Sequence, residues 1–192
     1  MCKEIALEQL TIQSEAISKV LARLRVTHSN GGAFIATFKI AENDVFDWFA
    51  SRNRILEYDI LSRLLRREEV RSQLSEISIP DAFAANVAEA CSITNSDGFS
   101  FDNPFLLDGQ LAQHLFAGRA YPYATKIDGK TAMQLAADYC EAIFNRRYED
   151  ISLYTSYEAW SPWFFGIAWD WSSIVFDRRN RTFWILVVTD TD

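Results

Sequence analysis

The sequence predicts an α+β fold in which several amphipathic helices pack on a small antiparallel sheet with a C-terminal β-hairpin. Apolar residues recur at helical spacing over most of the chain before residue 147, whereas residues 163–188 are aromatic and β-branched. Strand and helix segments do not alternate regularly, as they do around a parallel sheet. With 192 residues, 49% of them hydrophobic, the chain is expected to fold as one globular domain spanning residues 1–192.

The N-terminal segments predict a helix and then a strand. From Lys3 to Arg25, apolar side chains return at helical spacing, with glutamate, glutamine and lysine between them. The turn formers of residues 29–32 follow this helix, and their glycines permit positive φ angles. Residues 33–40 come next, and their β-branched and aromatic side chains predict a strand.

A long helix is expected after this strand. Residues 43–44 supply a candidate N-cap, and an apolar period of about 3.6 residues continues from Arg52 to Ile77. Pro80 marks its end, and a shorter helix is expected from Asp81 to about Cys91. The polar side of the long helix is interpreted as a solvated face with local ion pairs, formed by Arg63, Arg66, Arg67, Glu68, Glu69 and Arg71.

Two further helices are expected beyond a loop. Residues 94–108 gather many turn-forming residues and predict a long loop. A helix is expected from Asp108 to Ala117, closed by Gly118, and another from Thr131 to about Arg147.

Residues 163–176 and 182–188 are predicted to be the two strands of a terminal antiparallel hairpin, joined by a polar turn. Alternation along the first strand would place Trp169 and Trp171 on one face and Asp170 on the other. If the tryptophans fill the core, Asp170 faces water or a capping donor. If Asp170 points inward, it must be paired, and the tryptophans form an exposed patch. Core packing of the tryptophans is the preferred interpretation.

Composition narrows the classes of function. The formal net charge of −7 repels nucleic-acid backbones, so a nucleic-acid partner is not expected. No apolar run approaches the ~20 residues of a membrane span. Cys2, Cys91 and Cys140 lie far apart and form no CxxC pair, which argues against a disulfide framework and a zinc cluster. They are interpreted as reduced thiols of a cytoplasmic protein.

Motifs for catalysis and cofactor binding are missing from the sequence. It contains neither a phosphate-binding loop nor a serine nucleophile elbow. A thiolate activated by His114 could form at Cys91 or Cys140, but the preferred interpretation is that these side chains are packed or peripheral. Pairs of carboxylates occur without the spacing of a metal site. No cofactor and no metal are therefore predicted.

Three segments near the end of the chain carry a family resemblance. Trp163–Trp171, Val175–Asp177 and Trp184–Asp192 resemble the C-terminal hairpin of immunity proteins that accompany bacterial polymorphic toxins, including those of contact-dependent growth inhibition. The resemblance covers residues 163–192 alone. Such proteins are acidic, cytoplasmic single domains without catalysis, which mask the active site of a cognate toxin. The resemblance therefore implies an inhibitory protein-binding module, not an enzyme, with a basic toxin domain as its partner.

Candidate partner-binding residues follow from this hypothesis. Attraction between an acidic surface and a basic cleft speeds association, and aromatic anchors supply the desolvated centre of an interface. The acidic candidates are Glu42, Asp44, Asp47, Glu149, Asp150 and Glu158, and the aromatic candidates are Tyr154, Tyr157 and Trp160.

Two alternative functions stay open. A phage-encoded inhibitor of a host defence complex would share the acidic binding mode, and gene neighbourhood would separate it from an immunity protein. A small hydrolase or transferase would use a cysteine or a carboxylate pair, and a pocket around Cys140 or His114 would favour it.

Overall fold

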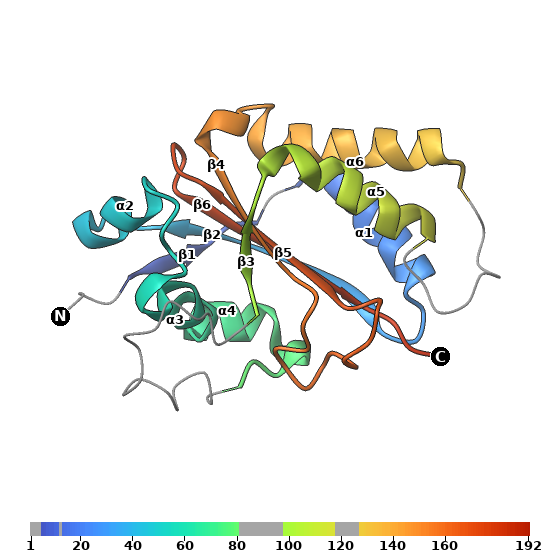
Figure 1. The fold of residues 1–192 in the computed structure, drawn as a ribbon, viewed down its shortest axis with the longest axis horizontal. Coiled ribbons are helices and arrows are strands. Elements are labelled where there is room, and N and C mark those ends of the chain that lie inside the picture. Colours follow the sequence, from blue (N-terminus) through green and yellow to red (C-terminus); the bar gives the residue numbers. More distant parts are fainter. Residues whose placement is uncertain (1–4, 12, 81–97, 118–126) are drawn as a thin grey trace.

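The structure, a computed structural model, describes residues 5–11, 13–80, 98–117 and 127–192. Its strands are β1 Leu7–Gln9, β2 Gly32–Ile40, β3 Ser100–Asp102, β4 Ile151–Ser156, β5 Trp171–Asp177 and β6 Thr182–Thr189. These strands form one antiparallel sheet in the order β1-β2-β6-β5-β4-β3, with helices on both faces (Figure 1). The predicted α+β class is confirmed.

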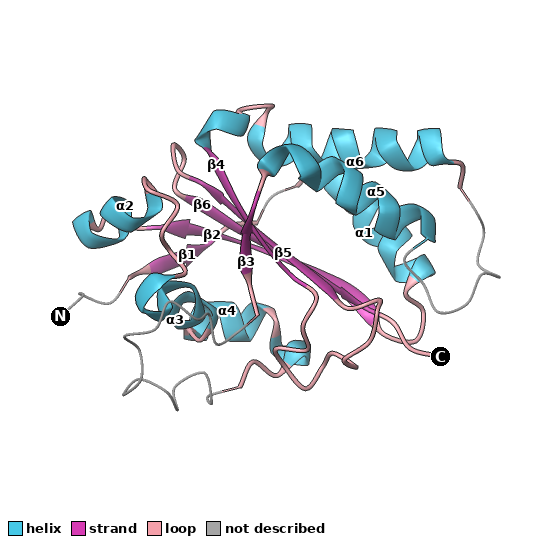
Figure 2. Ribbon diagram, in the orientation of Figure 1, coloured by secondary structure: helices cyan, strands magenta, loops and turns pink. Residues whose placement is uncertain are grey.

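Three helices cover each face of the sheet in the described part of the chain (Figure 2). On one face lie α1 Glu15–Thr27, α5 Leu107–Ala117 and α6 Gly129–Phe144; on the other lie α2 Asp44–Ala50, α3 Ile60–Leu65 and α4 Glu68–Gln73. Short 3-10 turns connect them: η1 Glu57–Asp59, η2 Ser75–Ile77, η4 Pro104–Leu106 and η5 Tyr148–Asp150. No helix among the described residues is both long enough and apolar enough to cross a membrane.

Strand β6 shows how the sheet serves two cores. Its odd-numbered residues from Phe183 to Val187 pack with α2, α3 and α4, while its even-numbered residues from Trp184 to Val188 pack with α1, α5 and α6. Successive side chains of a strand point to opposite faces, so a strand covered on both faces becomes an unbroken apolar run. Strands β4, β5 and β6 are buried along their whole length. The central strands β4, β5 and β6 therefore offer no accessible side chains, and exposed groups lie on loops, on the outer sides of helices and on the edge strands β1 and β3.

The predicted hairpin is confirmed in its pairing and wrong in its first boundary. Strands β5 and β6 pair antiparallel, with Ile174 opposite Ile185. The first strand begins at Trp171, whereas residues 163–170 form a loop in place of the predicted strand. The strand predicted over residues 33–40 is confirmed as β2.

The expected N-terminal helix is wrong over its first part. Residues Leu7–Gln9 form the edge strand β1, with Leu7 opposite Ile40. The helix begins only at Glu15, after Ser14, whose side chain accepts a hydrogen bond from the amide of Ile17. The residues of β1 pair with residues 29 to 33 positions further along the chain, which leaves no local signal, so periodicity alone extends the helix too far.

The long helix expected from Arg52 to Ile77 is also wrong. Left-handed backbone at Asn53, Tyr58 and Asp59 interrupts the chain, and Arg67 is extended between α3 and α4. The apolar positions are nevertheless buried throughout, as at Ile55. The apolar period of the sequence therefore identifies the buried residues correctly, because α2, α3 and α4 all pack their apolar sides against the sheet.

The remaining elements agree more closely with the prediction. Helices α5 and α6 confirm the two expected helices, and α6 ends at Phe144 because Asn145 adopts a left-handed conformation with φ 51°. Strand β4 was not predicted, and β3 lies within the loop expected over residues 94–108. The helix predicted over residues 81–91 and the cap at Gly118 lie outside the described residues.

Candidate protein-docking surface

The predicted partner-binding residues lie at opposite ends of the sheet. We call the end formed by residues 41–47, 147–150 and 177–182 the turn end, since it contains the β5–β6 turn. The amide of Ile40 donates to the carbonyl of Arg181 across this end at 2.8 Å. The opposite end contains the β4–β5 connection, residues 157–170, which we call the aromatic loop. The turn end holds Glu42, Asp44, Asp47, Glu149 and Asp150, and the aromatic loop holds Tyr157, Glu158 and Trp160.

Arginines neutralise much of the acidic charge at the turn end. Arg147 binds both carboxylate oxygens of Asp177, at 3.1 and 2.5 Å, and approaches Asp150 at 3.5 Å. Burial alone would raise the pKa of Asp177, but the bonds from Arg147 and Asn180 lower it below its usual value. Asp47 is likewise paired with Arg181. Ion pairs therefore engage Asp47 and Asp150 among the acidic candidates at this end, while Glu42, Asp44 and Glu149 are exposed.

Tyr154 and Trp160 do not contribute to the surface. The side chain of Tyr154 is fully buried in the core beneath α2, α3 and α4. Trp160 is 5% exposed, and its indole nitrogen donates to the hydroxyl of Ser172 at 2.8 Å. Their prediction as docking anchors is wrong because β4 is covered on both faces and the aromatic loop turns Trp160 inward.

A buried carboxylate holds the aromatic loop in shape. Asp170 is fully buried, and its Oδ2 accepts hydrogen bonds from the amides of Gly166 at 2.6 Å and Ile167 at 3.1 Å. Its Oδ1 accepts from the amide of Phe165 at 3.4 Å and from the hydroxyl of Thr189. One anion thus fixes three successive amides of the loop and ties them to the end of β6.

The structure combines the two sequence interpretations of this segment. Asp170 points inward and is paired, while Trp171 is fully buried in the core beneath α1, α5 and α6. Trp169 is only partly exposed. Strict alternation fails because residues 163–170 are not a strand.

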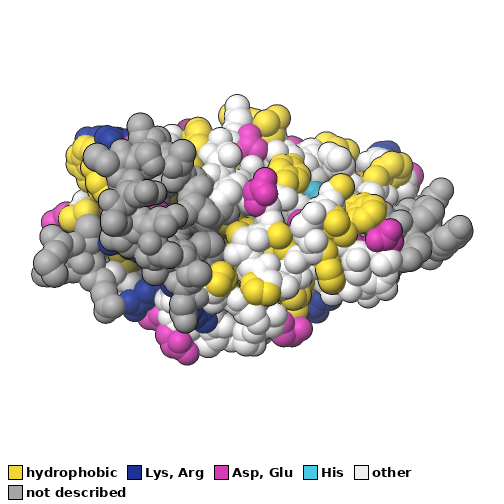
Figure 3. Space-filling model, turned by 60° about the horizontal axis from the view of Figure 1, so that its bottom comes forward, with side chains coloured by type: hydrophobic (Ala, Val, Ile, Leu, Met, Phe, Trp, Pro, Cys, Tyr) yellow, Lys and Arg dark blue, Asp and Glu magenta, His cyan; other side chains and the backbone are white. Residues whose placement is uncertain are grey.

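The outer side of the aromatic loop exposes aromatic rings beside carboxylates. Tyr157 is 54% exposed and Phe165 is 50% exposed. Burial raises the pKa of Tyr157, and the nearby charge of Asp102 adds to the shift. Glu158 is exposed, and its aliphatic stem rests on Gly98, where an added Cβ would lie 2.6 Å from the Cγ of Glu158. Figure 3 shows apolar side chains and carboxylates side by side on the face that includes the lower side of Figure 1.

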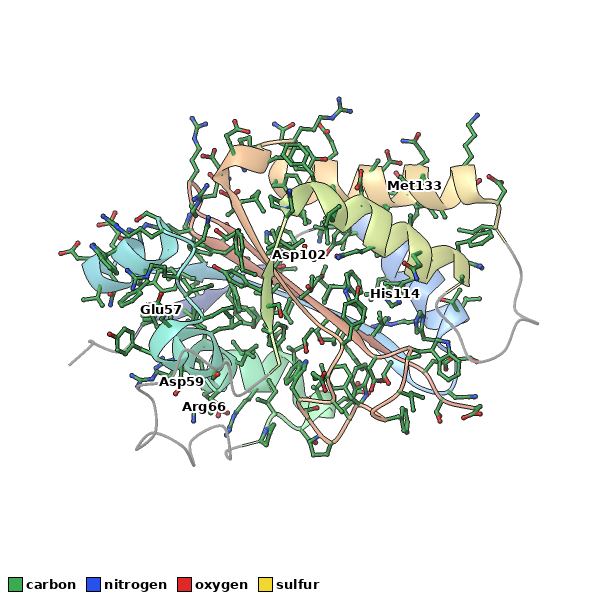
Figure 4. The ribbon with its side chains drawn as sticks, in the orientation of Figure 1. Glu57, Asp59, Arg66, Asp102, His114 and Met133 are labelled. Carbon is green, nitrogen blue, oxygen red and sulfur yellow. The ribbon has the colours of Figure 1, made fainter. Side chains whose placement is uncertain are left out.

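The environment of Cys140 opposes a thiolate nucleophile. Cys140 is 2% exposed, and burial raises its pKa to about 12, so the thiol stays protonated at neutral pH. His114, which is labelled in Figure 4, stacks on Trp171 at a centroid distance of 4.6 Å and lies 6.0 Å from His28. Burial lowers the pKa of His114 to about 3. Cys91 lies outside the described residues, and those that are described contain no cluster of His, Cys, Asp or Glu arranged for a metal ion.

Sequence reasoning missed Phe165 as a surface residue, because it assigned the position to a strand. Gly166 was the available signal. It has φ +72°, which favours glycine, and a glycine within an aromatic run indicates a turn. The hydrogen bond between Thr189 and Asp170 joins positions 19 residues apart, so no local sequence pattern predicts it.

Comparisons of the chain with protein-family models, with curated proteins and with solved structures find no match. The chemistry of the aromatic loop is therefore the basis for a functional proposal.

Proposed function

We propose that the chain is an inhibitory protein-binding module that docks through the aromatic loop and neutralises a bacterial toxin by masking its active site. The observation that carries the proposal is the buried Asp170 carboxylate, which fixes the backbone of residues 165–167 in a loop whose side chains Tyr157 and Phe165 are half exposed. Exposed aromatic side chains on a rigid support are typical of interface hot spots.

The energetics of Asp170 favour a role beyond connecting two strands. Burying a carboxylate costs several kcal/mol unless hydrogen bonds offset the loss of water. A two-residue turn would join β4 to β5 without any buried charge. The chain instead holds a long connection in one conformation. Binding a partner then costs less conformational entropy, because ordering a flexible interface costs about 0.5–1.5 kcal/mol for each side chain immobilised.

Charge supports a basic partner. The chain has a formal net charge of −7, and Glu158 projects from the aromatic loop beside Tyr157. An acidic surface attracts a basic cleft over long range and raises the rate of association. A nuclease toxin, whose own substrate is polyanionic, would present such a cleft.

The immunity role rests on the resemblance of residues 163–192, which include the β5–β6 hairpin. A phage-encoded inhibitor would use the same surface, and gene neighbourhood separates the two. Cys140 does not support the hydrolase, because its thiol is buried and stays protonated at neutral pH.

The test measures association with the toxin domain encoded beside this chain, at increasing ionic strength. We expect the association rate of the wild type to fall as salt rises, and Glu158→Lys to slow association by about tenfold at low salt. Glu42→Lys is the matched control, since it makes the same charge change at the turn end and should have a much smaller effect.

Three outcomes would contradict the proposal in different ways. A rate that responds neither to salt nor to Glu158→Lys would exclude acidic docking at the aromatic loop. A larger effect of Glu42→Lys would move the docking surface to the turn end. A neighbourhood without a toxin gene would remove the immunity role.

A further inference from the structure

The two histidines of the chain lie buried together where the last turns of α1 and α5 meet the sheet. His28, the C-cap residue of α1, is 1% exposed, and His114, in the last turn of α5, is 7% exposed. Their ring centroids are 6.0 Å apart, and the ring of His114 stacks on that of Trp171, the first residue of β5. Figure 1 shows α1 and α5 side by side on this face of the sheet. Two ionisable rings, which we call the histidine pair, therefore form part of the contact between the helix layer and the sheet.

The hydrogen bonds of the histidine pair suit neutral imidazoles. The Nδ1 of His28 lies 3.1 Å from the carbonyl oxygen of Leu24, and because a carbonyl can only accept, Nδ1 carries the proton of the neutral ring. The Nε2 of His28 is buried and has no hydrogen-bond partner among the described residues, and the same holds for the Nδ1 of His114. Protonation of both rings would bury two cations with centroids 6.0 Å apart.

Burial opposes protonation of the histidine pair more strongly than the surroundings favour it. Burial lowers the pKa of His28, although the charge of Asp190 acts to raise it. It also lowers the pKa of His114 to about 3, with the charge of His28 adding to the shift. The indole of Trp171 attracts an imidazolium, but this attraction is smaller than the cost of burial. Other ionisable groups on the elements packed around the pair are Asp190 after β6, Arg23 and Arg25 on α1, Asp170 before β5, and Tyr139 and Cys140 on α6.

His114 is separated by one residue from the carboxylate that holds the aromatic loop. Its ring stacks on Trp171, and Trp171 directly follows Asp170 in the chain. Trp171 is fully buried and lies opposite Val188 of β6. Movement of α5 away from β5 would uncover the indole and admit water to Asp170. Water would then compete for the hydrogen bonds between Asp170 and the amides of residues 165–167.

His28 is connected to the same carboxylate from the other side. Asn30, two residues beyond His28, donates its amide hydrogen to the Oδ1 of Asp190 at 3.0 Å. Asp190 directly follows Thr189, the hydroxyl of which donates to Asp170. The histidine pair is thus connected to both partners of the hydrogen bond between Thr189 and Asp170.

We propose that His28 and His114 form a pH-sensitive switch, in which protonation separates the ends of α1 and α5 from β5 and releases the aromatic loop. Two neighbouring cations repel each other, and both gain hydration when the helix ends move away. Helix ends open at a lower free energy than the central strands of a sheet, so the opening is local. The proposal concerns the free chain and does not depend on the proposed function.

Hydrogen exchange of the full chain, followed by mass spectrometry, tests the switch. Exchange is compared at pH 7 and pH 5, with and without 1 M urea, and corrected for the intrinsic exchange rates. We expect the protection of residues 107–117 and 163–171 to fall by about tenfold or more at pH 5, because the open conformation binds protons that the closed one does not. Urea should change their protection by less than about twofold, since local opening exposes little surface. Residues 183–187 of β6 should stay more protected, and urea should lower their protection by about tenfold or more.

Two variants of α5 assign the response to the buried imidazole. His114→Phe keeps an aromatic ring against Trp171 and should reduce the fall in protection at pH 5 by about tenfold. The matched control combines His114→Phe with Phe116→His, which moves the imidazole to a position that is 48% exposed, and it should respond as His114→Phe alone does. His28→Gln removes the other titrating ring and keeps an amide donor for the carbonyl of Leu24. The thermal unfolding midpoint at pH 7 shows whether each variant folds.

The wild type alone can contradict the switch. Protection of residues 163–171 that does not change with pH, or that equals the protection of residues 183–187 and responds to urea as strongly, would overturn the proposal. Among the variants, an undiminished pH response in folded His114→Phe or His28→Gln would overturn it, and so would a full response in the control with the exposed histidine.

Discussion

At the scale of single residues, burial and pairing decide which polar groups shape the surface. Asp170 is fully buried and organises the aromatic loop, while Asp177 is almost fully buried and organises the turn end through Arg147. The two carboxylates act at opposite ends of β5, one through backbone amides and one through an arginine. Each carboxylate holds one connection between strands in a defined conformation.

Replacing Asp170 tests its structural role. Asp170→Ala removes the acceptor for three amides and one hydroxyl, and we expect the free energy of unfolding in urea to fall by about 3 kcal/mol. Asp192→Ala, at an exposed position, should change it by less than about 0.5 kcal/mol. A loss below about 1 kcal/mol for Asp170→Ala would show that the network does not hold the loop.

The buried histidines predict how stability depends on pH. Burial, with His28 nearby, lowers the pKa of His114 to about 3, whereas an unfolded chain has a value of about 6.5. Between these values only the unfolded chain binds the proton, so the free energy of unfolding falls with falling pH, by about 1.4 kcal/mol per unit. His114→Phe keeps an aromatic ring against Trp171 and should remove this part of the slope in urea unfolding at several pH values. An unchanged slope would show that His114 is not the group responsible.

At the scale of elements, the sequence predicts those whose pattern is set locally. Strands β2 and β6 and helices α5 and α6 follow from apolar runs or helical periodicity, and Asn43 follows from capping chemistry. The breaks between α2, α3 and α4 cannot be predicted in this way, because the apolar residues keep a helical period across the breaks. Their left-handed residues are ordinary polar and aromatic ones without the glycine signal.

The candidate surface was predicted less well than the fold. Tyr157 and Glu158 are exposed as expected, whereas Tyr154 and Trp160 are buried. Exposure of an aromatic residue depends on which elements cover it, and the layer that covers Tyr154 comes from α2, α3 and α4, far along the chain. Arg179 and Arg181 of the β5–β6 turn pair with Asp150 and Asp47, and only the tertiary fold brings these residues together.

Helix α2 packs on one face of the sheet, and its cap can be tested by itself. The side chain of Asn43 accepts the amide of Phe46 at 2.9 Å. We expect Asn43→Ala to lower the free energy of unfolding by about 1 kcal/mol, and Asn43→Asp to leave it nearly unchanged, since aspartate caps equally well. If both variants lost the same free energy of unfolding, stability would depend on the amide group of Asn43 and not on the capping hydrogen bond to Phe46.

At the scale of the whole molecule, the sheet is covered on both faces, so binding chemistry is confined to the periphery. An antiparallel sheet often leaves one face to solvent, but here β4, β5 and β6 are buried throughout. The exposed aromatic side chains of the described residues include Tyr157 and Phe165 on the aromatic loop, Phe101 on β3 and Phe105 on η4.

The most direct test of docking through the aromatic loop compares two exposed phenylalanines. Phe165 lies on the loop and is 50% exposed, and Phe105 lies on η4 and is 65% exposed. With the toxin domain encoded beside this chain, we expect Phe165→Ala to raise the dissociation constant by about tenfold or more, mainly through faster dissociation, and Phe105→Ala to change it by less than about twofold. Equal effects of the two substitutions, or no effect of Phe165→Ala, would contradict docking through the aromatic loop.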